Sequence, residues 1–155
     1  MTSKLNSKLL GILTAIATVS ASFLIAQMTA QAHHRFVDDV GRQLLRVAVA
    51  SDLGGYDLTH DPFIDSVGDG QSDYITLNLR AGKSYGIVGV CDRDCSDIDL
   101  KLYDGSGNFI DSDIQSDDTP VVTVNPRWSG RYSIKVNMVS CNQNPCYYGV
   151  GVFGQ

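Results

Sequence analysis

The chain has 155 residues and a net charge of −5, with twelve Lys or Arg residues against seventeen acidic residues. That length fits a single domain with a core of its own. The acidic balance excludes a nucleic-acid-binding protein, because no cluster of basic residues forms the stripe that phosphate contacts require. All seventeen acidic residues are Asp, which favours turns and loops over helices, so the composition predicts a loop-rich β protein.

The N-terminal residues have the features of a secretory signal peptide. Two lysines precede an apolar run at residues 9–26, and the Ala-Gln-Ala sequence at residues 30–32 fits a cleavage site. A retained membrane anchor is the alternative, since the run approaches the length that spans a bilayer, but Thr and Ser residues dilute it. We therefore predict a signal peptide at residues 1–32, a periplasmic or secreted location, and no stable membrane insertion after cleavage.

Residues 35–53 predict an amphipathic helix. Apolar residues recur there at steps of three and four, an Asp pair lies in the first turn, and two glycines follow the last turn. We expect this helix to cover the edge or open face of a sheet rather than to bind a partner. A linker with little periodicity follows at residues 56–72, so that residues 33–72 are expected to hold the helix and the linker.

From residue 73 the apolar residues alternate with polar ones, as is typical of strands. The alternation at residues 75–79, a turn at residues 81–83 and an apolar run at residues 85–90 predict a hairpin whose second strand is central in its sheet. Five more strands are expected at residues 98–102, 109–110, 121–124, 132–139 and 147–153. Seven short strands predict an all-β fold, an antiparallel jelly-roll-like β-sandwich over residues 73–155.

Three segments resemble the bacterial pre-peptidase C-terminal domain family. They read SDYITLNLRAGKSYGIVGV, SDIDLKLYDGSGNFIDSD and SGRYSIKVNM, and together they span about residues 73–153. The second matches the family pattern D-x-D-L-x-L-x-D-x-x-G and the third matches G-x-Y-x-I-x-V. The resemblance implies a non-catalytic jelly-roll β-sandwich, of a kind usually attached to secreted peptidases and in some members dependent on calcium. The four cysteines and the N-terminal helix depart from the family, and no peptidase domain is recognisable in these 155 residues.

The four cysteines predict two disulfides, because an even number of cysteines in an exported chain favours oxidation. Their spacing favours the local pairs Cys91 with Cys95 and Cys141 with Cys146, while two other connectivities stay open. A zinc site is the rival, but spacings of three and four intervening residues without a nearby histidine argue against it. Neither pair has the two-residue spacing of a redox dithiol.

Aspartates gather in two neighbouring regions and form the candidate metal site. The candidate calcium ligands are Asp92, Asp94, Asp97, Asp99, Asp111 and Asp113. Calcium takes roughly six to eight oxygen ligands, and carboxylates this close repel one another unless a cation or hydrogen bonds compensate them. The spacing does not match an EF-hand. The alternative is that these side chains accept hydrogen bonds from backbone amides in turns.

The sequence offers few catalytic residues. The histidines after the predicted cleavage site are His33, His34 and His60, and neither a nucleophile elbow nor an HExxH helix occurs. The most concrete enzymatic alternative is a copper site, in which the amino group and ring of an N-terminal His33 chelate copper together with His60. Such a site would resemble that of secreted copper oxygenases of the histidine-brace type.

We therefore predict an exported, non-catalytic β-sandwich that binds or supports an extracellular or envelope partner, a glycan or a protein, with calcium as the candidate cofactor. Trp128 and Tyr103, with Tyr147 and Tyr148, are the candidate aromatic contacts, although core or edge packing is the alternative use of each. Two other functions stay open: the copper enzyme, and an envelope protein-interaction or peptidase-associated factor that acts through its helix.

Overall fold

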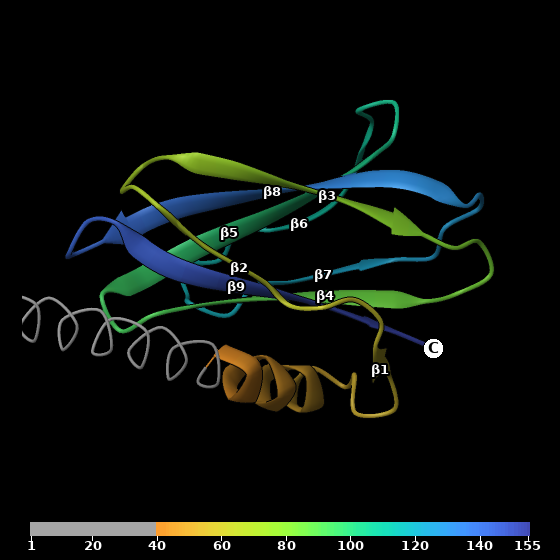
Figure 1. The fold of residues 1–155 in the computed structure, drawn as a ribbon, viewed down its shortest axis with the longest axis horizontal. Helices are drawn as coiled ribbons and strands as arrows, with labels where there is room; N and C mark the ends of the chain where they lie inside the picture. The colour runs from red at the N-terminus through yellow and green to blue at the C-terminus, as the bar shows by residue number, and fades with distance from the viewer. Residues whose placement is uncertain (1–39) are drawn as a thin grey trace, which may run out of the picture. The chain divides into compact units, whose positions relative to one another are not determined.

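The computed structural model describes residues 40–155. The predicted signal peptide, His33 and the first residues of the predicted helix lie outside the described residues. In the described part, residues 40–50 are helical and nine strands form two antiparallel sheets (Figure 1). These two sheets confirm the all-β antiparallel sandwich that the sequence predicts. The helix of the described part is not long and apolar enough to span a membrane.

One sheet has five strands and the other has four. The strands are β1 (Asp57–Leu58), β2 (Phe63–Val67), β3 (Ser72–Leu79), β4 (Tyr85–Cys91), β5 (Cys95–Asp104), β6 (Phe109–Asp113), β7 (Val121–Val124), β8 (Gly130–Cys141) and β9 (Cys146–Gly154). In the five-stranded sheet β4 lies between β7 and β9, and both β1 and β2 pair with the far side of β9. The four-stranded sheet has the order β3-β8-β5-β6.

The core lies between the two sheets and follows from the alternation of apolar residues. In β8 the side chains of Tyr132, Ile134, Val136 and Met138 are buried, and the residues between them are partly exposed. Every residue of β4 is buried, because this strand lies between two others and is covered on both faces. The prediction that this apolar strand is central in its sheet is therefore confirmed.

The helix at residues 40–50 covers the outer face of the five-stranded sheet (Figure 1). Val40 and Leu44 are buried. A Cβ atom added at Gly149 would overlap Val40, and one added at Gly151 would contact Leu44, so these glycines of β9 leave room for the helix. The expectation that the helix covers an open sheet face is confirmed for the described residues.

The structure corrects two expectations about the chain before β4. The segment at residues 56–72, expected to be a linker, contributes β1 and β2, which are short and pair only with β9. Such short edge strands need no regular alternation of apolar and polar residues, so no pattern in the sequence predicts them. The predicted hairpin does not form either, because β3 pairs with β8 in one sheet while β4 pairs with strands of the other. The turn at residues 81–83 reverses the chain without making its two strands partners.

Both predicted disulfides form, with the local pairing. Cys91 is bonded to Cys95 and Cys141 to Cys146, with Cα–Cα distances of 5.9 and 5.8 Å. Each bond joins the end of a strand in one sheet to the start of a strand in the other, and Cys95 lies opposite Cys141 in the β5–β8 pair. The two disulfides therefore fasten the sheets together at one end of the sandwich. Disulfides are typical of proteins exported to an oxidising compartment.

Candidate functional site

The sandwich has two long sides along which an edge strand of one sheet faces an edge strand of the other. On one side β6 faces β7, and this side is called the closed side. On the other side β2 faces β3, and this is called the open side. The two sides differ in what joins the sheets.

On the closed side, aspartates of one sheet bind backbone amides of the other. Asp111 Oδ2 accepts a hydrogen bond from the amide of Thr123 at 2.7 Å, and Asp113 Oδ2 accepts one from the amide of Val121 at 2.9 Å. Both aspartates belong to β6 and both amides belong to β7. The carboxylates thus take the place of a neighbouring strand, and these amides of the β7 edge are no longer free to pair with another chain.

Edge-strand aspartates also accept a hydrogen bond from the amide of the following residue. These contacts are Asp65 Oδ1 with Ser66 N at 2.7 Å, Asp73 Oδ1 with Tyr74 N at 2.7 Å, and Asp111 Oδ1 with Ser112 N at 2.9 Å. The short Asp side chain suits such local bonds to the backbone, whereas Glu would carry its carboxylate one carbon further away. This use of the carboxylates agrees with an acidic composition that consists of Asp alone.

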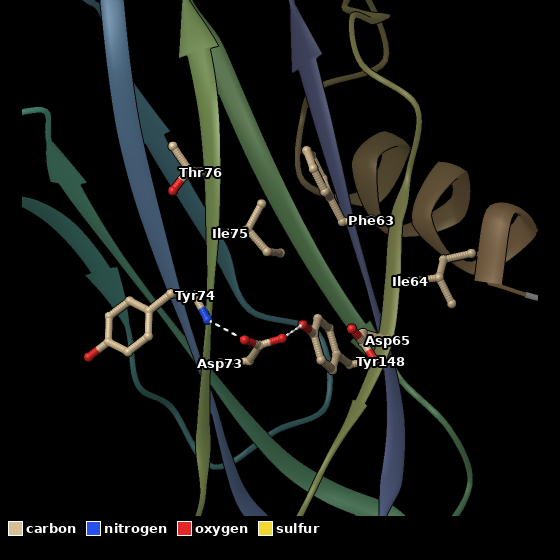
Figure 2. Close-up of a pocket in the computed structure, with 8 residues that line it drawn as sticks. All are labelled: Phe63, Ile64, Asp65, Asp73, Tyr74, Ile75, Thr76 and Tyr148. Atoms are coloured by element: carbon tan, nitrogen blue, oxygen red, sulfur yellow. Dashed lines mark hydrogen bonds between the residues drawn. The ribbon is translucent and has the colours of Figure 1, made fainter.

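The open side contains a pocket of about 360 Å³, called here the acidic pocket (Figure 2). It is lined by Phe63, Ile64, Asp65, Asp73, Tyr74, Ile75, Thr76 and Tyr148. Residues of β2 and of β3 form its two walls, and Tyr148 of β9 lies between them (Figure 2). The pocket therefore lies where the edges of the two sheets face each other.

Tyr148 links the two sheets across this pocket. Its hydroxyl donates a hydrogen bond to Asp73 Oδ2 at 2.6 Å, as Figure 2 shows. Burial raises the pKa of Tyr148 far above its ordinary value, and the hydrogen bond to Asp73 and the charges of Asp73 and Asp65 raise it further. The phenol is therefore neutral, and the charge of the pocket comes from the two carboxylates.

The acidic pocket combines negative charge with aromatic surface. Asp65 and Asp73 supply the charge, and its lining includes no Lys or Arg. Phe63, which is half-buried, and the buried Tyr148 supply the aromatic surface (Figure 2). The ring of Tyr74 is 62% exposed and lies on the other side of β3 from Asp73, 6.0 Å from the Lys135 ammonium, measured to the ring centroid. Carboxylates beside aromatic rings suit a cationic group of a ligand. Sequence reasoning named Tyr148 as a contact but missed both aspartates.

Four of the six predicted calcium ligands are occupied by hydrogen bonds at two different places. Asp92 Oδ2 accepts from the amide of Tyr147 at 2.9 Å, and Asp94 Oδ1 accepts from the side chain of Gln143 at 3.1 Å. These two aspartates connect one disulfide loop to the other, whereas Asp111 and Asp113 bind β7 on the closed side. Within residues 40–155, no three His, Cys or Asp side chains are grouped so that they could hold a metal ion. The calcium hypothesis stays a prediction.

The other two predicted ligands lie in β5. Asp99 Oδ2 accepts a hydrogen bond from the Asn137 side chain at 3.2 Å, across the β5–β8 pair. Asp97 lies at an irregularity in the β5–β8 register, and its Oδ1 atom is buried without a hydrogen-bond partner among the described residues. Burial and then the charge of Asp99 raise the pKa of Asp97, Asp117 adds to this, and a hydrogen bond from Ser116 opposes it. Asp97 is the least well compensated of the six carboxylates.

The predicted aromatic contacts differ in exposure. Trp128, in the loop between β7 and β8, is 59% exposed, and Tyr147 is also exposed. Tyr103 packs edge-on against Phe109, with ring centroids 6.1 Å apart. Tyr103 therefore packs at the edge of its sheet in this structure, whereas the Trp128 side chain is largely exposed.

One of the two residues of the predicted copper site, His33, lies outside the described residues. His60 lies before β2, with Nδ1 2.9 Å from the Thr59 hydroxyl and Nε2 3.2 Å from the carbonyl oxygen of Asn78. Both ring nitrogens of His60 thus already have hydrogen-bond partners. The copper hypothesis stays a prediction.

Comparison with known proteins finds similarity in fold only. No known protein family and no curated protein matches the chain. The solved structures that resemble it include the pre-peptidase C-terminal domain of a collagenase from Bacillus anthracis, which is 17% identical with a TM-score of 0.47, over 59% of this chain and 86% of that chain. They also include a periplasmic inhibitor of g-type lysozyme from Aeromonas hydrophila, 14% identical with a TM-score of 0.46, over 61% of this chain and 84% of that chain. The first belongs to the family that the sequence motifs resemble.

Proposed function

We propose that the chain is an exported, non-catalytic binding module that takes an extended, basic polypeptide segment into the acidic pocket. The two disulfides support export. The observation that carries the proposal is the contrast between the two sides of the sandwich. Carboxylates join the sheets on the closed side, whereas the open side keeps a pocket with two carboxylates in its walls.

An extended polypeptide fits this pocket because both walls are edge strands. Strand edges recognise extended chains through main-chain groups, with pockets that receive alternate side chains. β3 pairs with β8 alone, so its alternate amides and carbonyls face away from that partner. The amide of Tyr74 is already bonded to Asp73, and by alternation the next backbone groups on that side belong to Thr76. Thr76 lines the pocket and is the expected point of main-chain contact.

A basic side chain complements the charge of the pocket. An ammonium or guanidinium group would lie between the carboxylates of Asp65 and Asp73, where charge-assisted hydrogen bonds are strong. The aliphatic part of a Lys or Arg side chain would pack on Phe63. The partner of this proposal is therefore a protein segment that places Lys or Arg beside its backbone contact with β3.

Two synthetic peptides test the proposal, one alternating Thr with Lys and the other alternating Thr with Asp. We expect the Lys peptide to shift the NMR amide signals of residues 63–65 and 73–76, and the Asp peptide to leave them unchanged. Asp65→Asn combined with Asp73→Asn should weaken binding of the Lys peptide roughly tenfold, since two charged contacts become neutral ones. The matched control is Asp118→Asn, which neutralises an exposed aspartate outside the pocket.

An unchanged affinity of the double variant would overturn the proposal, as would shifts confined to other parts of the sheet. A neutral oligosaccharide serves as the competing ligand. If it shifts the pocket signals and the Lys peptide does not, the pocket binds a glycan and the polypeptide proposal fails.

A further inference from the structure

A second pocket, of about 430 Å³, lies further along β3, where the chain turns toward β4. It is lined by Thr59, His60, Asn78, Arg80, Lys83 and Tyr85, and is called here the basic pocket. Its lining contains no Asp and shares no residue with the acidic pocket. We infer that the basic pocket binds an oxyanion group, a phosphate, sulfate or carboxylate carried by a larger molecule.

Two cations of this pocket have no carboxylate partner. The side chains of Arg80 and Lys83 are exposed, and neither forms an ion pair within residues 40–155. The guanidinium group of Arg80 offers paired donors that match the oxygens of a carboxylate or phosphate, and the Lys83 ammonium adds a point charge. In a chain of net charge −5, this pocket is a local region of opposite sign.

Both ring nitrogens of His60 have hydrogen-bond partners in the wall of the pocket. Its Nε2 atom lies 3.2 Å from the carbonyl oxygen of Asn78, which only accepts, so Nε2 carries a proton. Its Nδ1 atom lies 2.9 Å from the Thr59 hydroxyl, which donates its own proton to the carbonyl oxygen of Val152. The two contacts of the His60 ring hold this wall of the pocket in place.

Tyr85 supplies a buried donor. The residue is 5% exposed, and its hydroxyl accepts a hydrogen bond from the amide of Arg80 at 3.2 Å. The proton of this hydroxyl has no acceptor among the described residues. A donor left unsatisfied in a buried position costs free energy, and an oxyanion in the pocket would accept it. The basic pocket thus combines positive charge with an unused hydroxyl donor on the largely buried Tyr85.

The size of the pocket indicates the class of molecule. Pockets for small molecules are roughly 300–1,000 Å³, and a volume of about 430 Å³ lies in that range. It accommodates more than an inorganic ion, so the anionic group is expected on a molecule of at least the size of a sugar. A uronic acid and a sugar phosphate share this chemistry.

The probes of the test are inorganic phosphate, glucuronate and neutral glucose, added to the full exported chain at low ionic strength. We expect saturable shifts of the NMR amide signals of residues 78–85 with phosphate or glucuronate, weakened by added salt, and none with glucose. Arg80→Gln should weaken the binding roughly tenfold, because a charge-assisted contact is lost. The matched control is Arg93→Gln, which removes an exposed arginine in the loop between Cys91 and Cys95 and should bind as the wild type does.

The inference is overturned if neither anion gives saturable shifts, or if Arg80→Gln binds as tightly as the wild type. Binding of glucuronate without phosphate assigns the site to an acidic sugar, and the reverse assigns it to a phosphate-bearing molecule. Thermal unfolding confirms that each variant folds, and Lys83→Gln provides a second variant with the same expected direction. The basic and acidic pockets share no residues. The result for anion binding in the basic pocket is therefore independent of whether the acidic pocket binds the Lys peptide.

Discussion

The closed and open sides use the same residue type in different ways. On the closed side, Asp111 and Asp113 reach the other sheet and bind amides of β7, so their carboxylates contribute to structure. On the open side, Asp65 and Asp73 each bind an amide of their own strand, and only Asp73 reaches across, to the Tyr148 hydroxyl. An edge-strand aspartate is therefore structural where an amide of the opposite sheet lies within reach. Where none does, it lines a pocket.

The largest expected effect comes from breaking the closed side with Asp111→Ala and Asp113→Ala together. Each change removes a charged acceptor from an amide of β7, and since these bonds are partly exposed we expect a loss of about 1 kcal/mol each in the free energy of unfolding, measured by urea denaturation. The uncovered β7 edge should also increase self-association, measured by sedimentation.

The control for this pair is Asp118→Ala, since Asp118 is exposed and lies in the loop between β6 and β7. It should leave both measurements unchanged. If the double variant is as stable and as monomeric as the wild type, water replaces the carboxylates, and the distinction between the two sides has no energetic basis.

A smaller effect is expected on the open side from Tyr148→Phe. The change removes the bond to Asp73, and because the pocket admits water the free energy of unfolding should fall by about 1 kcal/mol at most. The carboxylate of Asp73 becomes free for a ligand, so the affinity for the Lys peptide should be kept or should increase. Isothermal titration calorimetry measures this affinity for the Lys peptide. A marked loss of affinity in a stable variant would show instead that the phenol itself contacts the ligand.

Most of the fold could be predicted because its signals are local. Alternation over residues 75–79 and 132–138 predicts strands, a three- and four-residue step predicts the helix, and short spacing predicts the two disulfides. Which strands pair could not be predicted in this way. The turn between β3 and β4 has the residues of a hairpin, yet it crosses between sheets, because partner choice depends on strands far along the chain.

The candidate sites were harder to predict, since their partners are backbone groups or distant strands. Asp111 and Asp113 are conspicuous in the sequence as acids, but the amides of Val121 and Thr123 that they bind have no side-chain signature. The walls of the acidic pocket come from edges of different sheets. Only the sheet topology brings these walls together, so proximity in sequence could not point to Asp65 and Asp73.

The smallest expected effect concerns Asp97, whose buried Oδ1 atom has no hydrogen-bond partner among the described residues. Because burial and the charge of Asp99 raise its pKa in the folded state, the folded protein binds the proton more tightly than the unfolded chain does. The wild type therefore loses stability as the pH rises through this pKa. Asp97→Asn should have a higher unfolding midpoint than the wild type at neutral pH. This advantage should shrink as the pH falls through the raised pKa of Asp97 toward the ordinary pKa of Asp, and should change no further below it.

Calcium provides the sharpest test of this comparison, because a bound cation would compensate the charge at the Asp97 Oδ1 atom, which has no hydrogen-bond partner among the described residues. If calcium raises the unfolding midpoint of the wild type but not of Asp97→Asn, the predicted metal site exists and includes this carboxylate. If calcium changes neither midpoint while Asp118→Asn behaves as the wild type, the calcium hypothesis fails. The other five predicted ligands then act through hydrogen bonds to backbone or side-chain groups, and Asp97 is the one of the six whose charge costs stability.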